Sequence, residues 1–188
     1  MRKAGWLITG LCLAALPVLA ADTGALTQES RATVKAFFGQ LKGELETAMK
    51  AGGPVNAIQV CNKVAPAIAE DLSKQYQGKV ARTSLKYRNR ANKPDAWETR
   101  VMQDFEQRKA AGTPIEALEV AEVVEQDGKR VFRYMKAIPT GEVCLKCHGQ
   151  KIDPAVTARL DELYPGDMAR GFAQGDLRGA FTLVKELD

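Results

Sequence analysis

One short motif near the end of the chain restricts its possible structures more than any other feature. Cys144-Leu145-Lys146-Cys147-His148 places two thiols two residues apart, and the only histidine of the chain follows them directly. Two such thiols each add to one vinyl group of a haem, and the adjacent imidazole is then held beside the iron. The motif therefore predicts one covalently attached c-type haem on Cys144 and Cys147, with His148 as an iron ligand.

Two other chemistries use paired cysteines, namely zinc binding and thiol–disulfide exchange. A structural zinc site needs about four Cys or His ligands. Beyond the motif and the N-terminal Cys12, the chain offers only Cys61. A redox dithiol of the thioredoxin type comes with a surrounding fold pattern that this sequence lacks. The cysteine content therefore favours the haem over both alternatives.

The first 20 residues have the features of a secretory signal peptide. Arg2 and Lys3 form a positive n-region, an apolar run follows over residues 6–16, and small residues precede Ala21. We expect cleavage after Ala20, export to the periplasm and a single domain over residues 21–188. The alternative is an uncleaved N-terminal anchor. No later segment approaches the length of a membrane span, so none is expected after cleavage.

Charge argues against one class of partner. Removal of Arg2 and Lys3 lowers the formal net charge from +4 by two, which leaves the mature chain nearly neutral. Binding to nucleic acid needs a strong basic field, so we expect no nucleic-acid partner. A content of 45% hydrophobic and 27% charged residues suits one globular domain.

Hydrophobic periodicity predicts helices and strands in roughly equal measure. Helices are expected over 27–49, 95–111 and 154–163, and another begins at Pro54 and is interrupted at Pro66. Cys61 falls on the apolar face of that helix. Strands are expected over 79–85 and 179–187, and a hairpin over 117–125 and 129–138 around Gln126-Asp127-Gly128. The pattern predicts an α+β fold with helices packed on a mostly antiparallel sheet.

The second axial ligand of the iron stays open at this stage. A single histidine excludes bis-His ligation within one molecule. The candidates are Cys61, a lysine, water, no ligand, or one of the methionines Met49, Met102, Met135 and Met168. A ferric iron accepts a thiolate, and Cys61 has no disulfide partner once the motif is occupied. The alternative is that Cys61 is a small buried apolar residue.

A basic segment lies between the predicted strand at 79–85 and the next helix. Arg82 and Lys86 in this segment are predicted to contact the two propionates of the haem, because guanidinium and ammonium groups pair naturally with carboxylates. The alternative is a solvated loop whose charges have no specific partner.

Several ordered segments resemble the Tll0287-like family of haem-binding domains. The resemblance covers nearly all of the mature chain and implies a PAS-like fold and a c-type haem with His148 and Cys61 as axial ligands. This chain departs from longer members in having no later membrane span and no kinase or cyclase module. The matching segments are 57–61 with 65–69, 82–89, 92–98, the motif at 144–148, and 164–167 continuing through Gly171 to 176–180.

Three functions are consistent with these features. The first is a haem-based redox or small-ligand sensor, with CO, NO or O2 as ligand and an unidentified signalling partner. The second is a periplasmic electron-transfer cytochrome with an unidentified redox partner and no ligand switching. The third is a thiolate-haem enzyme such as a peroxidase. We expect no enzyme, because the sole histidine is proximal and no distal histidine is available as an acid or base.

Overall fold

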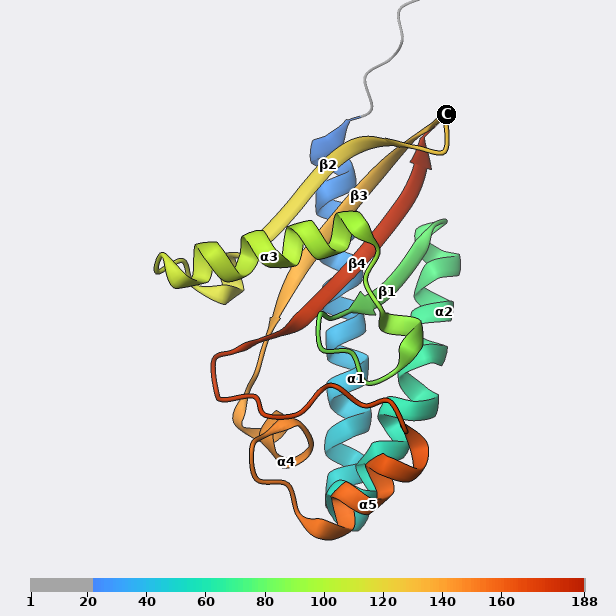
Figure 1. Ribbon diagram of the computed structural model, residues 1–188. Coiled ribbons are helices and arrows are strands. Elements are labelled where there is room, and N and C mark those ends of the chain that lie inside the picture. The colour runs from blue at the N-terminus through green and yellow to red at the C-terminus, as the bar shows by residue number, and fades with distance from the viewer. Residues whose placement is uncertain (1–21, 188) are drawn as a thin grey trace, which may run out of the picture.

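The computed structural model describes residues 22–187, so the predicted signal peptide lies outside the described residues. In this part of the chain, no helix is both long and apolar enough to cross a membrane. A four-stranded antiparallel sheet has helices on both of its faces (Figure 1). The predicted α+β class is therefore confirmed.

The first helix, α1 (Thr23–Gln59), consists of two helical segments joined at a sharp break. Asp22 caps its first turn by accepting hydrogen bonds from two backbone amides. Gly52 and Gly53 have non-helical backbone angles, and the φ of 66° at Gly53 favours glycine. Pro54 then begins the second segment, as the sequence predicts.

A wide helical turn carries Cys61. The π-helix η1 (Val60–Val64) follows α1 and leads directly into α2 (Ala65–Tyr76). Pro66 lies in the first turn of α2, where its missing N–H removes no helical hydrogen bond. The predicted interruption at Pro66 thus takes the form of a π-helix immediately before it. Such turns occur frequently at functional sites.

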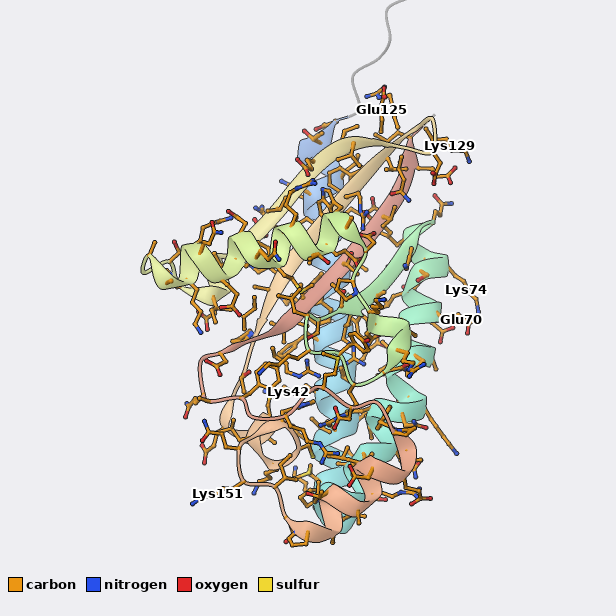
Figure 2. The ribbon with its side chains drawn as sticks, in the orientation of Figure 1. Lys42, Glu70, Lys74, Glu125, Lys129 and Lys151 are labelled. Carbon is orange, nitrogen blue, oxygen red and sulfur yellow. The ribbon has the colours of Figure 1, made fainter. Side chains whose placement is uncertain are left out.

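All neighbouring strands of the sheet are antiparallel. The strand order is β1-β4-β3-β2, with β1 (Lys79–Thr83), β2 (Glu119–Gln126), β3 (Lys129–Pro139) and β4 (Leu177–Leu187). β2 and β3 form the predicted hairpin, and both turn residues, Asp127 and Gly128, have positive φ. Glu125 and Lys129 lie at this end of the sheet (Figure 2).

The strands β1 and β4 differ by two residues from their predicted bounds. β1 ends at Thr83 because Ser84 turns out of the strand, where its amide donates to the carbonyl of Asn92 at 3.2 Å. β4 begins before Gly179, which lies against β1. A Cβ atom at Gly179 would lie 2.3 Å from the carbonyl oxygen of Thr83, so only glycine permits this close approach.

The sheet separates two hydrophobic cores. Helices α1 and α2 cover one face, and α3 (Ala96–Ala110) crosses the other (Figure 1). Alternate residues of β3 contribute to each core, as the strand period requires: Phe132 and Tyr134 pack toward α1 and α2, and Met135 packs toward α3. The helix α3 begins at Asp95, which forms the capping box expected from its sequence.

The chain makes one long excursion between β3 and β4. It contains the short helices η4 (Glu142–Cys144) and α4 (Leu145–His148) and the longer α5 (Pro154–Leu163), which was predicted. Helix α5 packs on the end of α1 through Ile58, Val156, Leu160 and Tyr164. The excursion therefore holds the Cys-x-x-Cys-His motif at the end of the fold where α1 passes into the π-helix (Figure 1). Two single-turn 3-10 helices, η2 (Arg90–Asn92) and η3 (Ile115–Ala117), lie in other loops.

Candidate haem-binding site

The Cys-x-x-Cys-His motif forms a single helical turn at one edge of the site. Cys144 ends η4, and Cys147 and His148 end α4. Both thiols are half-buried and free of any disulfide. Burial raises the pKa of Cys147, although the positive charge of Arg88 opposes this shift. The motif thus presents two reduced thiols on one turn, which is the arrangement that haem attachment requires.

The imidazole of His148 is held by a backbone carbonyl. Its Nδ1 atom lies 2.8 Å from the carbonyl oxygen of Ala169. Burial lowers the pKa of His148 well below its usual value, and the charges of Arg178 and Arg88 lower it further. Because a carbonyl oxygen can only accept, Nδ1 is the donor in this contact, and Nε2 is the nitrogen left to bind a metal. Metal-binding histidines are commonly oriented by this kind of hydrogen bond.

A second loop, residues 167–172, pairs with the motif and fixes its position. The amide of Phe172 donates to the carbonyl of His148 at 2.9 Å, and the amide of Gly171 donates to that of Gly149 at 3.0 Å. A Cβ atom at Gly149 would lie 2.5 Å from the carbonyl oxygen of Leu145, so this position needs glycine. The ring of Phe172 stands edge-on to the imidazole, with 6.2 Å between the ring centres.

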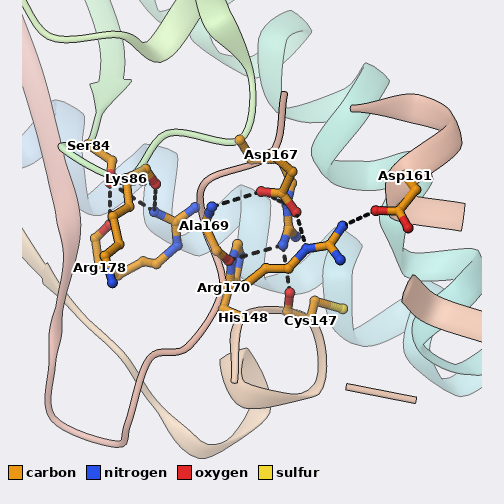
Figure 3. A network of polar contacts seen from close by, with 10 residues as sticks. Ser84, Lys86, Cys147, His148, Asp161, Asp167, Ala169, Arg170 and Arg178 are labelled. Atoms are coloured by element: carbon orange, nitrogen blue, oxygen red, sulfur yellow. Dashed lines mark hydrogen bonds and ion pairs between the residues drawn. The ribbon is translucent and has the colours of Figure 1, made fainter. Parts of the chain in front are cut away.

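Arg88 ties the motif to this second loop through its guanidinium. Its Nη2 donates to the carbonyl of Cys147 at 2.6 Å and to that of Ala169 at 3.1 Å. Its Nε lies 3.0 Å from Asp167 Oδ1, and both side chains are buried. Burial would raise the pKa of Asp167, but hydrogen bonds from Arg88 and Arg170 outweigh it and lower the pKa. The buried pair of Arg88 with Asp167 is thus joined to His148 through the carbonyl of Ala169, and Figure 3 shows Asp167, Ala169 and His148 in this network.

Cys61 lies close to the motif, although 83 residues separate it from Cys144. It is half-buried in the π-helix. Cys147 packs against the cluster that contains Ile58, three residues before Cys61. The Cys61 thiol contributes electrostatically to the pKa shifts of Cys147, Arg82 and Arg178. The structure therefore brings the predicted second ligand to the same site as the motif.

An open cavity of about 350 Å³ adjoins this space. Its walls include Asn62, which follows Cys61 in the sequence, together with Arg88 and Tyr164. Burial raises the pKa of Tyr164, although a hydrogen bond with Asn62 opposes this shift. The cavity thus lies next to Asn62, the neighbour of Cys61 in the sequence, and next to Arg88, which holds the motif.

The two predicted propionate contacts differ in their surroundings. Arg82 is half-buried, and burial lowers its pKa. Lys86 is exposed, and its Nζ lies 5.3 Å from the ring centre of Phe172. Arg178, which the sequence did not single out, lies above the same ring at 5.2 Å. Burial lowers the pKa of Arg178 to about 10, and repulsion from Arg88 and Arg82 contributes.

These residues fit a covalently attached haem. The site combines two free thiols on one turn, an imidazole whose Nε2 is left to bind a metal, a third thiol in the π-helix and half-buried cationic donors for carboxylates. Within residues 22–187, no group of three or more His, Cys, Asp or Glu side chains comes together to hold a metal ion.

Fold and site together define a class of α+β proteins in which the connection between the last two strands carries a Cys-x-x-Cys-His turn. The chain belongs to the Tll0287-like family, whose model matches residues 19–184. The resemblance read from the sequence is thereby confirmed. No curated protein sequence matches the chain.

One solved structure has a similar fold, the crystal structure of the cyanobacterial heme-protein Tll0287. The TM-score is 0.62 at 21% sequence identity, over 85% of this chain and 96% of that one. At this level of sequence identity, the comparison shows a shared fold and nothing more. The Cys144–His148 motif, Cys61 and the arginines are therefore interpreted from their own geometry.

Proposed function

We propose that this protein is an exported monohaem c-type cytochrome, with the haem attached to Cys144 and Cys147 and ligated by His148. The single observation that carries this proposal is the hydrogen bond of His148, which donates from Nδ1 to the carbonyl of Ala169 and leaves Nε2 to bind iron. A bound haem would supply a one-electron redox centre with a second axial position. Family membership and the heme-protein fold neighbour support the same cofactor.

Cys61 is the proposed second axial ligand. It borders the same space as Cys147, whereas Met102 and Met135 are buried in the core beneath α3, across the sheet from α1 and α2. Met168 is half exposed. The π-helix supports this assignment, because a wide turn presents a residue that a regular α-helix would place differently. The sequence predicts Arg82 and Lys86 as contacts of the haem propionates, and the exposed position of Lys86 supports that role less than the half-burial of Arg82 does.

The proposed role is that of a redox or small-ligand sensor. A thiolate is a good ligand for ferric iron and its neutral thiol a poor one, so protonation of Cys61 would free the second axial position. The cavity beside Asn62 supports entry of CO, NO or O2 on this side. A sheet flanked by α1, α2 and α3 supports the PAS-like description. The partner would be a signalling protein that binds differently when Cys61 in the π-helix is bound to the iron and when it is released.

The runner-up is an electron-transfer cytochrome in which His148 and Cys61 stay bound in both oxidation states. The half-burial of both motif thiols favours it to some degree, because an accessible haem edge suits exchange with a redox partner. An enzyme such as a peroxidase has less support. His148 is the sole histidine and donates to Ala169, so no second histidine serves as acid or base.

The decisive experiment is to express the full chain, with its signal segment, in a host that matures c-type cytochromes. The periplasmic fraction should contain a protein whose denatured mass includes one haem, cleaved after Ala20. Electron paramagnetic resonance of the oxidised form should show a low-spin thiolate-ligated iron. The sensor proposal predicts that the reduced form binds CO, whereas the electron carrier does not.

One result would overturn the cytochrome proposal, and another would overturn the sensor role alone. A chain that matures without haem mass while a control cytochrome in the same cells is matured would remove the cofactor. Retention of the haem with an unaltered six-coordinate spectrum on reduction, and no change on addition of CO, would leave a cytochrome but exclude the sensor. A Cys144→Ser/Cys147→Ser double variant provides the control without attachment sites.

A further inference from the structure

The site contains more positive charge than its carboxylates balance. Arg88 donates to the carbonyl that holds His148, and Arg178 lies 5.2 Å from the ring centre of Phe172, which stands edge-on to His148. Arg82 precedes Ser84 by two residues, and the Ser84 hydroxyl accepts from Arg178. Among the described residues, the carboxylate that acts on Arg178 is that of Asp167. Asp167 is already shared, because Arg88 Nε lies at 3.0 Å and Arg170 Nε at 2.9 Å. Arg82 and Arg178 therefore have charges that no described carboxylate neutralises.

Neighbouring groups orient the guanidinium of Arg178, but they do not use all of its hydrogen-bond donors. Its Nη1 donates to Ser84 Oγ at 3.1 Å and lies 3.4 Å from the carbonyl oxygen of Lys86. Its Nε is buried and has no hydrogen-bond partner within the described chain. Figure 3 shows the side chain beside the network that holds His148. A half-buried cation with a buried, unpaired donor is costly to fold unless an anion completes it.

Arg82, like Arg178, has a guanidinium group without a carboxylate partner in the described part of the chain. It projects from β1, and its guanidinium lies 5.6 Å from the ring centre of Phe37. Within residues 22–187 its guanidinium takes no part in the side-chain hydrogen bonds and ion pairs that hold Arg88 and Arg178. Burial lowers the pKa of Arg82, and electrostatic effects of Cys61 and Tyr164 oppose this shift. Its planar guanidinium group is therefore free to donate two parallel hydrogen bonds to one carboxylate.

We propose that Arg82 and Arg178 bind the two carboxylate groups of the haem, one arginine for each. The inference rests on the proposed function, since it concerns the same site. Two unpaired guanidinium groups match two propionates in number and in sign, and guanidinium–carboxylate pairs are the strongest fit for a buried ion pair. Lys86 lies at the exposed rim, where its carbonyl helps to hold Arg178.

The test compares holoproteins in which one arginine at a time loses its charge. The variants are Arg82→Gln, Arg178→Gln and Arg178→Lys, with Arg108→Gln as the matched control. Arg108 lies on α3 and pairs with Asp104, away from the site. Each variant is examined for haem mass, for its midpoint reduction potential by spectroelectrochemistry, and for the propionate-bending bands in resonance Raman spectra.

We expect a lower potential in both glutamine variants, because loss of a nearby positive charge favours the more positive ferric state. We also expect a shifted propionate band in each, whereas Arg108→Gln should change neither. Arg178→Lys should shift the band while changing the potential less, since lysine keeps the charge but not the bidentate geometry. If Arg178→Gln loses its haem, the lysine variant provides the same two readouts.

Wild-type potential and wild-type propionate bands in Arg82→Gln and Arg178→Gln would overturn the inference. That result leaves the proposed function intact, because the haem mass on Cys144 and Cys147 would still be present. Conversely, a wild-type chain without any haem mass would contradict the proposed function itself. The two failures are therefore distinguished by the mass measurement alone.

Discussion

The carbonyl oxygen of Ala169 lies 2.8 Å from Nδ1 of His148, and it also accepts a hydrogen bond from Arg88 at 3.1 Å. One backbone oxygen thus fixes the imidazole and joins it to the buried pair of Arg88 with Asp167. The position of the histidine depends on a loop 21 residues further along the chain. Changes in that loop should therefore affect the motif without touching it.

Replacement of Arg88 by Gln should be strongly destabilising. It leaves the Asp167 carboxylate buried with Arg170 as its remaining partner, and removal of one member of a buried pair costs about 3 kcal/mol or more. Urea unfolding of the holoprotein measures this loss. Arg170→Gln is the control, because Arg170 is partly exposed and its loss should cost no more than about 1 kcal/mol. Equal losses in the two variants would contradict a special role for Arg88.

Replacement of Cys61 by Ser should change the iron without removing the haem. The attachment sites stay intact, so the denatured mass should still include one haem. The ferric spectrum should lose its thiolate character, because a serine hydroxyl is a far weaker ligand than a thiolate. Electron paramagnetic resonance of the oxidised variant measures this change. A Met168→Leu variant is the control and should keep the wild-type spectrum, and an unaltered spectrum in Cys61→Ser would remove Cys61 as a ligand.

Much of the fold could be predicted from the sequence because its signals are local. The turn at Asp127-Gly128, the break at Gly52-Gly53 and the capping box at Asp95 depend on residues close together in the chain. The π-helix is an exception. Pro66 indicates an interruption, but whether it becomes a kink or an inserted residue depends on packing against the rest of the chain.

The site was predictable only where one motif held all the information. Cys144, Cys147 and His148 are adjacent, so their chemistry follows from spacing. Arg88 and Asp167 are 79 residues apart and resemble ordinary solvated loop charges in the sequence. Arg178 lies in a strand, outside the basic segment that drew attention to Lys86. Such residues become visible only when the fold brings three distant loops together.

A carboxylate far from the motif gives the fold a dependence on pH. Hydrogen bonding from Arg31, with contributions from Tyr134 and Lys136, lowers the pKa of Glu119 from 4.5 to about 2. A lowered folded-state pKa adds stability above the unfolded value, and this is lost as the pH falls from about 4.5 toward about 2. The full shift corresponds to about 3 kcal/mol, which solvent screening at the exposed Arg31 reduces to about 1–2 kcal/mol.

We therefore expect Glu119→Gln to be less stable than the wild type by about 1–2 kcal/mol at pH 7, with the difference vanishing near pH 2. Urea unfolding at several pH values measures both curves. Glu125→Gln, at the exposed end of the same strand, is the control and should follow the wild-type curve. A constant difference between Glu119→Gln and the wild type across this range would show that the carboxylate charge contributes nothing.

The last prediction concerns a buried network of charged side chains on the face of the sheet that α3 covers. The side chains of Arg133 and Glu98 are both nearly inaccessible, and their Nη2 and Oε1 atoms lie 3.5 Å apart. Arg133 also pairs with Asp95 at 2.7 Å and stacks on Trp97, with 4.3 Å from its guanidinium carbon to the ring centre. Thr182 donates to the same oxygen of Glu98 at 2.7 Å.

Arg133→Met alone should cost about 3–5 kcal/mol, because it leaves the Glu98 carboxylate buried without its cation. Adding Glu98→Gln to that variant should recover part of the loss, since the amide oxygen can still accept from the Asp95 amide while the amide nitrogen donates to the Thr182 hydroxyl, without a buried charge. Urea unfolding of the wild type, both single variants and the double variant gives the coupling energy. The haem spectrum should be unchanged throughout, because this network lies across the sheet from α1 and α2. Additive losses would mean that Arg133 and Glu98 act independently, and that Arg133 is held mainly by Asp95 and by stacking on Trp97.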